Sequence, residues 1–137
     1  MKLDSKNFES TVKENRIVLV DFWAQWCGPC RMLNPIMDSL EEKYKGRAII
    51  GKVNADEELD LSVDHGIRSI PQVMIYKDGE IVERFAGVSA ERMYAEKLDY
   101  YLSGIESEQK VKEEVKEEVK EEVKEEIEEL IEKEEEK

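Results

Sequence analysis

The chain has 137 residues, a formal net charge of −13 and two cysteines. This length allows one domain with a proper hydrophobic core, but not two domains of typical size. The excess of acidic side chains argues against nucleic-acid binding, because phosphate recognition needs clustered Lys and Arg.

The charge is unevenly distributed. Residues 106–137 contain 16 acidic and 7 basic side chains, a net charge of −9, so the first 105 residues carry −4. We therefore divide the chain into a domain over residues 1–105 and an acidic tail over residues 106–137. The start of the chain, Met1–Ser5, has no apolar core of signal-peptide length, and no apolar run approaches the length of a membrane span. We expect a cytoplasmic protein, in which an isolated pair of cysteines is more often catalytic or metal-binding than structural.

The first half of the domain alternates helical and strand patterns. A short helix is expected first, with Asp4 or Ser5 as its N-cap and with Phe8 and Val12 on one face. The elements expected after it are a buried strand over Ile17–Phe22, a helix over Cys27–Tyr44 with Pro35 in its interior, a strand over Ala48–Val53 and a short helix over Glu57–His65.

The second half of the domain ends in a hairpin and a helix. Asp78-Gly79 lies between the runs Gln72–Tyr76 and Ile81–Phe85, which is a strong hairpin signal. Apolar side chains recur at helical spacing over Tyr94–Ile105 and predict a final amphipathic helix. This order of elements requires a mixed sheet, with parallel crossovers first and an antiparallel hairpin last. The predicted fold class is therefore α/β, a central mixed sheet flanked by helices.

The tail has a repeat of its own. Six Val or Ile side chains recur every four residues from Val111 to Ile131, with Lys-Glu-Glu between most of them. A four-residue period advances by about 40° per repeat around an α-helix, so these side chains form no continuous seam for a coiled-coil partner. Three interpretations stay open: a solvated helix, a disordered segment and a helix that binds a partner.

Both cysteines lie directly after the buried strand, in the segment Trp26-Cys27-Gly28-Pro29-Cys30. The two intervening residues place both sulfur atoms within disulfide reach if the segment opens a helix, because positions three apart share a helix face. A thiol attacks as thiolate, and a helix N-terminus lowers the pKa of a cysteine there. The spacing therefore indicates redox chemistry at the rim of the sheet.

The string VDFWAQWCGPC, together with Ile70 and Pro71 further along the chain, resembles the thioredoxin family over about residues 3–105. The resemblance implies the thioredoxin fold and a protein-disulfide reductase that works by thiol–disulfide exchange, in electron transport and cell redox homeostasis. It implies disulfide-containing protein substrates, a thioredoxin reductase as partner, a monomer, and no bound cofactor beyond the redox-active disulfide Cys27–Cys30. The acidic tail is not part of the resemblance.

The resemblance also implies roles for residues around the cysteines. Cys27 is expected to attack a substrate disulfide, and Cys30 is expected to resolve the mixed disulfide that results. Gly28 and Pro29 help to set the redox poise, and in the family this Gly-Pro pair accompanies a reductant.

Asp21 stands in the middle of the apolar strand, where burial would raise its pKa towards the range useful for a general base. The family has a buried Asp at this position, so we expect Asp21 to accept the proton of Cys30, with Lys52 as the neighbouring lysine that modulates it. Pro71 matches the family's cis-proline. The residues expected to form the apolar substrate-binding rim are Trp26, Ile70, Pro71, Gly87 and Val88.

Other interpretations of the cysteine pair are weaker. Zinc would need two further ligands, and the only histidine, His65, is expected to be a surface or capping residue without a catalytic part. A structural disulfide would close too short a loop to add much stability. Two other functions are possible: an oxidase or isomerase on the same fold, which Gly28-Pro29 disfavours, and a redox-inactive binding module or scaffold whose tail recruits a partner.

Overall fold

A computed structural model describes residues 1–136. The chain divides into two compact units, one over residues 1–102 and one that begins at Ser103. The strands are β1 (Lys2–Leu3), β2 (Ile17–Trp23), β3 (Ile49–Asn54), β4 (Gln72–Lys77) and β5 (Glu80–Ala86). The helices are α1 (Phe8–Glu14), α2 (Gly28–Lys43), α3 (Leu59–Asp64) and α4 (Glu91–Glu135).

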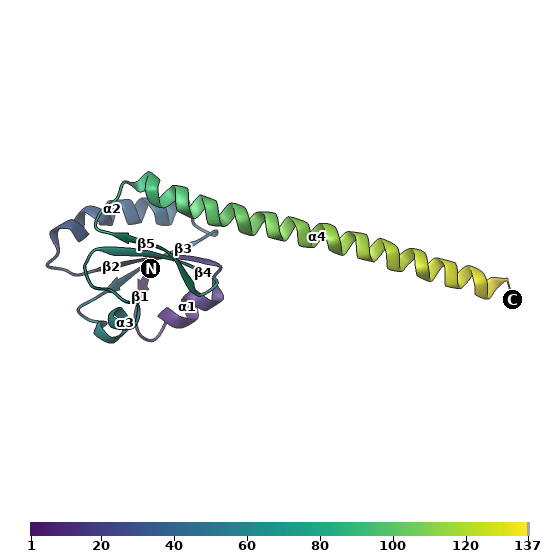
Figure 1. Ribbon diagram of the computed structural model, residues 1–137, viewed down its shortest axis with the longest axis horizontal. Helices are drawn as coiled ribbons and strands as arrows, with labels where there is room; N and C mark the ends of the chain where they lie inside the picture. Colours follow the sequence, from purple (N-terminus) through teal and green to yellow (C-terminus); the bar gives the residue numbers. More distant parts are fainter. Residues whose placement is uncertain (137) are drawn as a thin grey trace. The chain divides into compact units, whose positions relative to one another are not determined.

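The first unit is built on one five-stranded sheet with the strand order β1-β3-β2-β4-β5 (Figure 1). β2 pairs with β3 in parallel and with β4 in antiparallel orientation, and β4 and β5 form the expected hairpin. The predicted mixed sheet flanked by helices is confirmed. As the middle strand, β2 is covered on both faces, and residues 17–22 are all buried.

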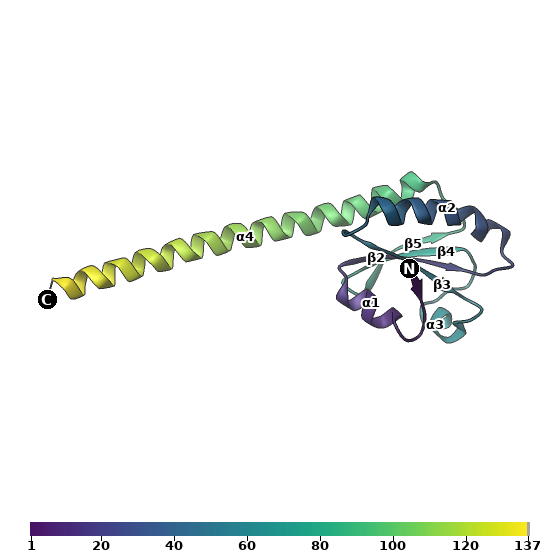
Figure 2. The same ribbon diagram turned by 180° about the vertical axis from the view of Figure 1, so that it is seen from behind.

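The alternation of side chains along β2 determines which residues face which helices. Val20 and Phe22 belong to a core cluster with Phe8 and Val12 of α1. Asp21 lies between them in the sequence and therefore points to the opposite face, which α2 covers (Figures 1 and 2). α2 buries one face of its own, formed by Cys30, Leu33, Met37 and Leu40.

The beginning of α4 packs within the first unit. The hydroxyl of Tyr44 at the end of α2 donates to the Asp99 carboxylate at 2.7 Å and lies 3.2 Å from the Ala95 carbonyl oxygen. The ring of Tyr94 meets that of Phe85 on β5 at a centroid distance of 4.8 Å. The expected amphipathic helix is thus present, and it closes the same face of the sheet as α2.

One strand was not predicted. β1 has only two residues, too few to show a hydrophobic period, yet it pairs in parallel with β3 and its Leu3 is fully buried beside Val53. Gly51 on β3 leaves room for the Leu3 side chain, because a Cβ atom at this position would clash with it. β1 is therefore the edge strand of the sheet, next to β3.

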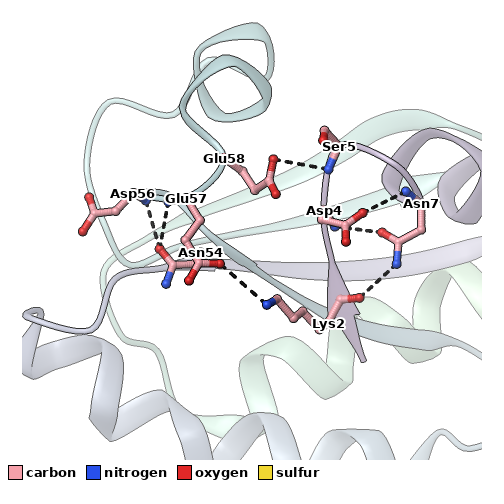
Figure 3. Close-up of polar contacts among 8 residues, drawn as sticks. All are labelled: Lys2, Asp4, Ser5, Asn7, Asn54, Asp56, Glu57 and Glu58. Carbon is pink, nitrogen blue, oxygen red and sulfur yellow. Dashed lines mark hydrogen bonds and ion pairs between the residues drawn. The ribbon is translucent and has the colours of Figure 1, made fainter.

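The start of α1 also differs from the expectation. The helix begins at Phe8, and neither Asp4 nor Ser5 is its N-cap. The Asp4 carboxylate instead accepts hydrogen bonds from the backbone N–H groups of Lys6 and Asn7, of which Figure 3 shows the second, so it caps the turn that precedes the helix. A short polar side chain favours a turn and a helix start alike, which explains the difference.

In the second unit, α4 continues to Glu135, and every side chain from 106 to 136 is exposed. The repeated Val and Ile side chains are about half exposed, from 47% at Val123 to 58% at Val111. Within residues 1–136, no helix combines the length and the apolar character needed to cross a membrane.

Candidate active site

The cysteine pair lies at the start of α2. Cys27 is the N-cap residue of the helix, Gly28 and Pro29 form its first turn, and a disulfide bond joins Cys27 to Cys30 with the two Cα atoms 5.3 Å apart. The Cys27 sulfur accepts a hydrogen bond from the backbone N–H of Cys30 at 3.2 Å. A negative charge on this sulfur would therefore lie at the positive end of the helix dipole.

A small apolar cluster surrounds the sulfur atoms. Cys27 and Cys30 are 5% and 1% exposed and pack with Ala24, the residue that follows β2. The partly buried side chains of Trp23 and Ile70 pack against this cluster. The structure therefore brings Ile70, which is distant in sequence, to the cysteine pair.

Pro71 and Gly87 meet at the adjacent loops. The Ile70–Pro71 peptide bond is cis and Pro71 is buried. The backbone N–H of Gly87 donates to the Pro71 carbonyl oxygen at 2.9 Å, and Gly87 has a φ of +76°, a conformation that favours glycine. Val88 follows and is 38% exposed. These contacts fix the loop after β5 beside the cis-proline.

Trp26 is an exposed residue with an anchored ring. Its side chain is 69% exposed, and its indole N–H donates to the Asp56 carboxylate at 2.8 Å. Asp56 is held in turn, because its backbone N–H and that of Glu57 donate to the Asn54 side-chain oxygen (Figure 3). Asp56 was not predicted. The sequence could have indicated it, because Trp26 follows β2 and Asp56 follows β3, and the carboxyl ends of neighbouring parallel strands meet at one edge of the sheet.

Asp21 is fully buried, and among the described protein atoms neither carboxylate oxygen has a hydrogen-bond partner. Burial raises the pKa of Asp21 from 3.8 to about 6, while the nearby positive charge of Lys52 acts in the opposite direction. Lys52 is the direct partner of Asp21 in the parallel pairing of β2 and β3. The structure thus brings together the carboxyl and the lysine that the resemblance had connected.

The ammonium group of Lys52 has two other neighbours. It donates a hydrogen bond to the side-chain oxygen of Asn34 on α2, and it lies 5.7 Å from the ring centroid of Trp23. Asn34 was not predicted as a site residue. It follows Cys30 by four positions and so shares its helix face, which is the signal that could have drawn attention to it.

His65 lies apart from the cysteine pair. It caps the C-terminus of α3, as expected, but its ring is half-buried rather than on the surface: it lies 4.6 Å from the Phe8 ring, and Nδ1 is 2.8 Å from the Tyr76 hydroxyl. Burial lowers the pKa of His65. Across residues 1–136, no group of three or more His, Cys, Asp or Glu side chains is arranged to hold a metal ion.

The family model Thioredoxin matches residues 1–99. The chain belongs to the thioredoxin family. It is 44% identical over 98 residues to a thioredoxin of Chlorobaculum thiosulfatiphilum, a match that covers 71% of this chain and 91% of the relative. It is 45% identical over 96 residues to thioredoxin 1 of Synechococcus elongatus, which covers 69% and 90% of the two chains. The resemblance inferred from the motif is confirmed.

Solved thioredoxin structures have the same fold. A mutant thioredoxin from Halobacterium salinarum superposes with a TM-score of 0.70 at 31% identity, covering 74% of this chain and 89% of that one. Plasmodium falciparum thioredoxin gives 0.67 at 28% identity, covering 73% and 97%. With its bonded Cys27–Cys30 pair, this member of the family is a dithiol–disulfide oxidoreductase. Neither the comparisons nor the site favour a redox-inactive binding module.

The raised pKa of Asp21 predicts a pH-dependent stability. The folded protein binds this proton more tightly than the unfolded chain, whose carboxyl titrates near 3.8, so stability falls as the pH rises to about 6 and then stays level. Asp21→Asn removes this loss and should raise the free energy of unfolding by about 1–3 kcal/mol at about pH 8, with little change at about pH 4. Urea unfolding of the oxidised protein measures both values.

The control for this experiment is Asp38→Asn, at an exposed position on α2. It should leave the free energy of unfolding nearly the same at both pH values. An equal gain from Asp21→Asn at both pH values would show that the burial of charge is not the cause.

Proposed function

We propose that this chain reduces protein disulfides in the cytoplasm, with Cys27 as nucleophile, Cys30 as resolving thiol and Asp21 as proton acceptor. The observation that carries the proposal is the placement of the Cys27 sulfur at the N-terminus of α2, where it accepts the Cys30 N–H. A buried carboxyl lies on the sheet face that the same helix covers. This arrangement supports a stable thiolate at Cys27 and a base for Cys30.

The reaction proceeds by two exchanges. The Cys27 thiolate of the reduced protein attacks one sulfur of a substrate disulfide, which forms a mixed disulfide and releases the other substrate sulfur as a thiolate that takes up a proton. Cys30 then loses its proton and attacks the Cys27 sulfur. This step forms the Cys27–Cys30 disulfide and releases the second substrate thiol, so that two electrons have passed from the protein to the substrate.

Asp21 is suited to the second exchange because its pKa of about 6 lies close to neutral pH. As a carboxylate it can accept the Cys30 proton, and after substrate release it returns that proton to solvent. Lys52 modulates this acidity, since its positive charge favours the carboxylate form.

The substrate would bind across the rim around the cysteine pair. The exposed side chains of Trp26 and Val88 supply apolar surface, while Ile70 and the cis-proline Pro71 offer a ledge along which an extended chain can pair its backbone. Gly87 supports this ledge through its hydrogen bond to Pro71.

Membership of the family implies disulfide substrates and a thioredoxin reductase as partners. We infer that such a reductase returns Cys27 and Cys30 to the dithiol, that the chain acts as a monomer, and that it needs no cofactor or metal beyond its own disulfide. The Gly28-Pro29 pair supports the reducing direction rather than an oxidase or isomerase activity.

Two serine variants test the roles of the cysteines. Cys27→Ser should abolish reduction of a fluorescent peptide disulfide, because no nucleophile is left at the start of α2. Cys30→Ser should also stop turnover but accumulate a mixed disulfide, because attack survives and resolution does not. Mass spectrometry under non-reducing conditions measures the adduct on each variant after a single exposure to substrate. Equal amounts of adduct on both variants would contradict the assignment of nucleophile and resolving thiol.

Asp21→Asn tests the base. We expect a slower resolution of the mixed disulfide, by about 10- to 100-fold near pH 7, because general-base catalysis is lost. The rate of substrate attack by Cys27 should change much less. Stopped-flow measurement of both steps between about pH 6 and pH 9 separates them, and an unchanged resolution rate across this range would remove Asp21 from the mechanism.

We further infer that residues 1–105 form the redox domain and that the acidic segment 106–137 is a separate tail. The support is the exposure of every side chain from 106 to 136 and the change of sequence pattern after Ile105. Because of their four-residue spacing, the valines also do not line up on one face of the helix. The tail is therefore suited to solvation, or to contact with a basic partner, rather than to the chemistry of the cysteines.

Truncation after Ser107 tests this division. The shortened chain should keep its rate of disulfide reduction and its melting temperature, because no buried side chain is removed. Solubility, or binding to a basic partner at low salt, should change instead. A calorimetric melting temperature lower by more than about 4 °C, roughly 1 kcal/mol for a domain of this size, would show that the tail stabilises the domain.

A further inference from the structure

The hydrogen bond between Lys52 and Asn34 is a polar contact that the proposed reaction does not use. Asn34, one turn after Cys30 on α2, accepts a hydrogen bond from the ammonium group of Lys52 through its side-chain oxygen. The same ammonium lies over the Trp23 ring. The Lys52 side chain is therefore held between a helix and the end of β2, on the sheet face where Asp21 is buried.

Lys52 and Trp23 line a groove of about 560 Å³ that holds other partners for the ammonium group. Three carboxylates line it, those of Asp38, Glu41 and Glu57. Glu41 pairs with the N-terminal amine of the chain and Glu57 with Lys2, both at 3.6 Å. Asp38 lies on α2 one turn beyond Asn34, within the same groove. An unrestrained ammonium would be attracted towards these carboxylates.

We propose that Asn34 is a positioning residue, whose side-chain oxygen keeps the Lys52 ammonium at the Asp21 side of the groove and away from the carboxylates of Asp38, Glu41 and Glu57. Asn34 thereby sets the pH at which Asp21 exchanges its proton. This proposal rests on the role of Asp21 in the proposed function, and it adds a residue that belongs neither to the cysteine pair nor to the proposed substrate rim.

Among the described residues, Lys52 is the one charged group that contributes to the pKa of Asp21. Lys52 is the register partner of Asp21 on β3, and the partner on β4 is the apolar Val73. On α2, which covers this face of the sheet, Cys30 has no titratable thiol in the disulfide form. Lys52 is thus the neighbouring cation that lowers the pKa of Asp21 against the effect of burial. A movement of this cation towards the carboxylates of the groove weakens its interaction with Asp21 and raises the pKa of the Asp21 carboxyl.

The test is a carbon-13 NMR titration of the Asp21 carboxyl in the oxidised protein. Asn34→Ala should raise the titration midpoint by about 0.5–1 unit, a part of the shift that a close cation produces. In a Lys52→Met background, Asn34→Ala should cause no further shift, because there is no ammonium left to position. Ser39→Ala, which also removes a polar group from an exposed position of α2, should leave the midpoint unchanged.

Three results would overturn the proposal: an unchanged midpoint in Asn34→Ala, a lowered midpoint, or an equal shift with and without Lys52. The first would show that Trp23 alone holds the lysine. The second would show that Asn34 draws the ammonium away from Asp21. The third would show that Asn34 acts on Asp21 without Lys52. Alanine favours a helix, so the variant keeps α2 intact.

A rate measurement separates this proposal from the proposed function. If Asp21 is the base, the pH profile of mixed-disulfide resolution in Asn34→Ala should move by the same amount as the NMR midpoint. A shifted midpoint with an unmoved pH profile would retain Asn34 as the residue that positions Lys52 and would reject Asp21 as the base. The NMR titration does not depend on turnover, so each conclusion has its own observable.

Discussion

The pairing of β2 with β3 is the constraint on which the rest of the site depends. This register puts Asp21 beside Lys52, and Trp23 beside Asn54, whose side chain fixes the turn that carries Asp56. A shift of one residue would exchange the two faces of β2, so the carboxyl would enter the apolar cluster beneath α1. The same hydrophobic pattern that folds the sheet therefore also places the carboxyl on the face that α2 covers.

The burial of Asp21 lowers the stability of the folded state and raises the pKa of the carboxyl by the same physical effect. A carboxyl without hydrogen bonds in an apolar layer destabilises the folded state once it is ionised. That unfavourable environment is also what brings its proton into the neutral range. The other residues from Ile17 to Phe22 are apolar and buried, so this loss of stability is confined to one position of β2.

The sequence predicts the elements that have a clear local signal, such as an apolar run, a turn dipeptide or a cysteine motif. The apolar run Ile17–Phe22 predicts the central strand, the Asp78-Gly79 turn predicts the hairpin, and the CGPC segment predicts the redox pair. The two-residue strand β1 is too short to carry a period. The contacts of Asn34 and Asp56 arise only when α2 and β3 come together, and a single polar residue in a sequence does not indicate its partner. Local propensity placed the start of α1 a few residues early, because Asp4 suits a turn as well as a cap.

The hydrogen bond from Trp26 to Asp56 has a consequence for the range of substrates. The indole N–H of Trp26 already donates to Asp56, so a bound partner does not have to supply a hydrogen-bond acceptor. The ring can therefore contact chains of very different sequence. Its orientation is also fixed in advance, so the Trp26 side chain loses little conformational entropy when a partner binds against it. A preorganised apolar surface of this kind favours the binding of many different substrates over the recognition of one sequence. Discrimination among substrates then depends on how easily each disulfide can approach the sulfur atoms.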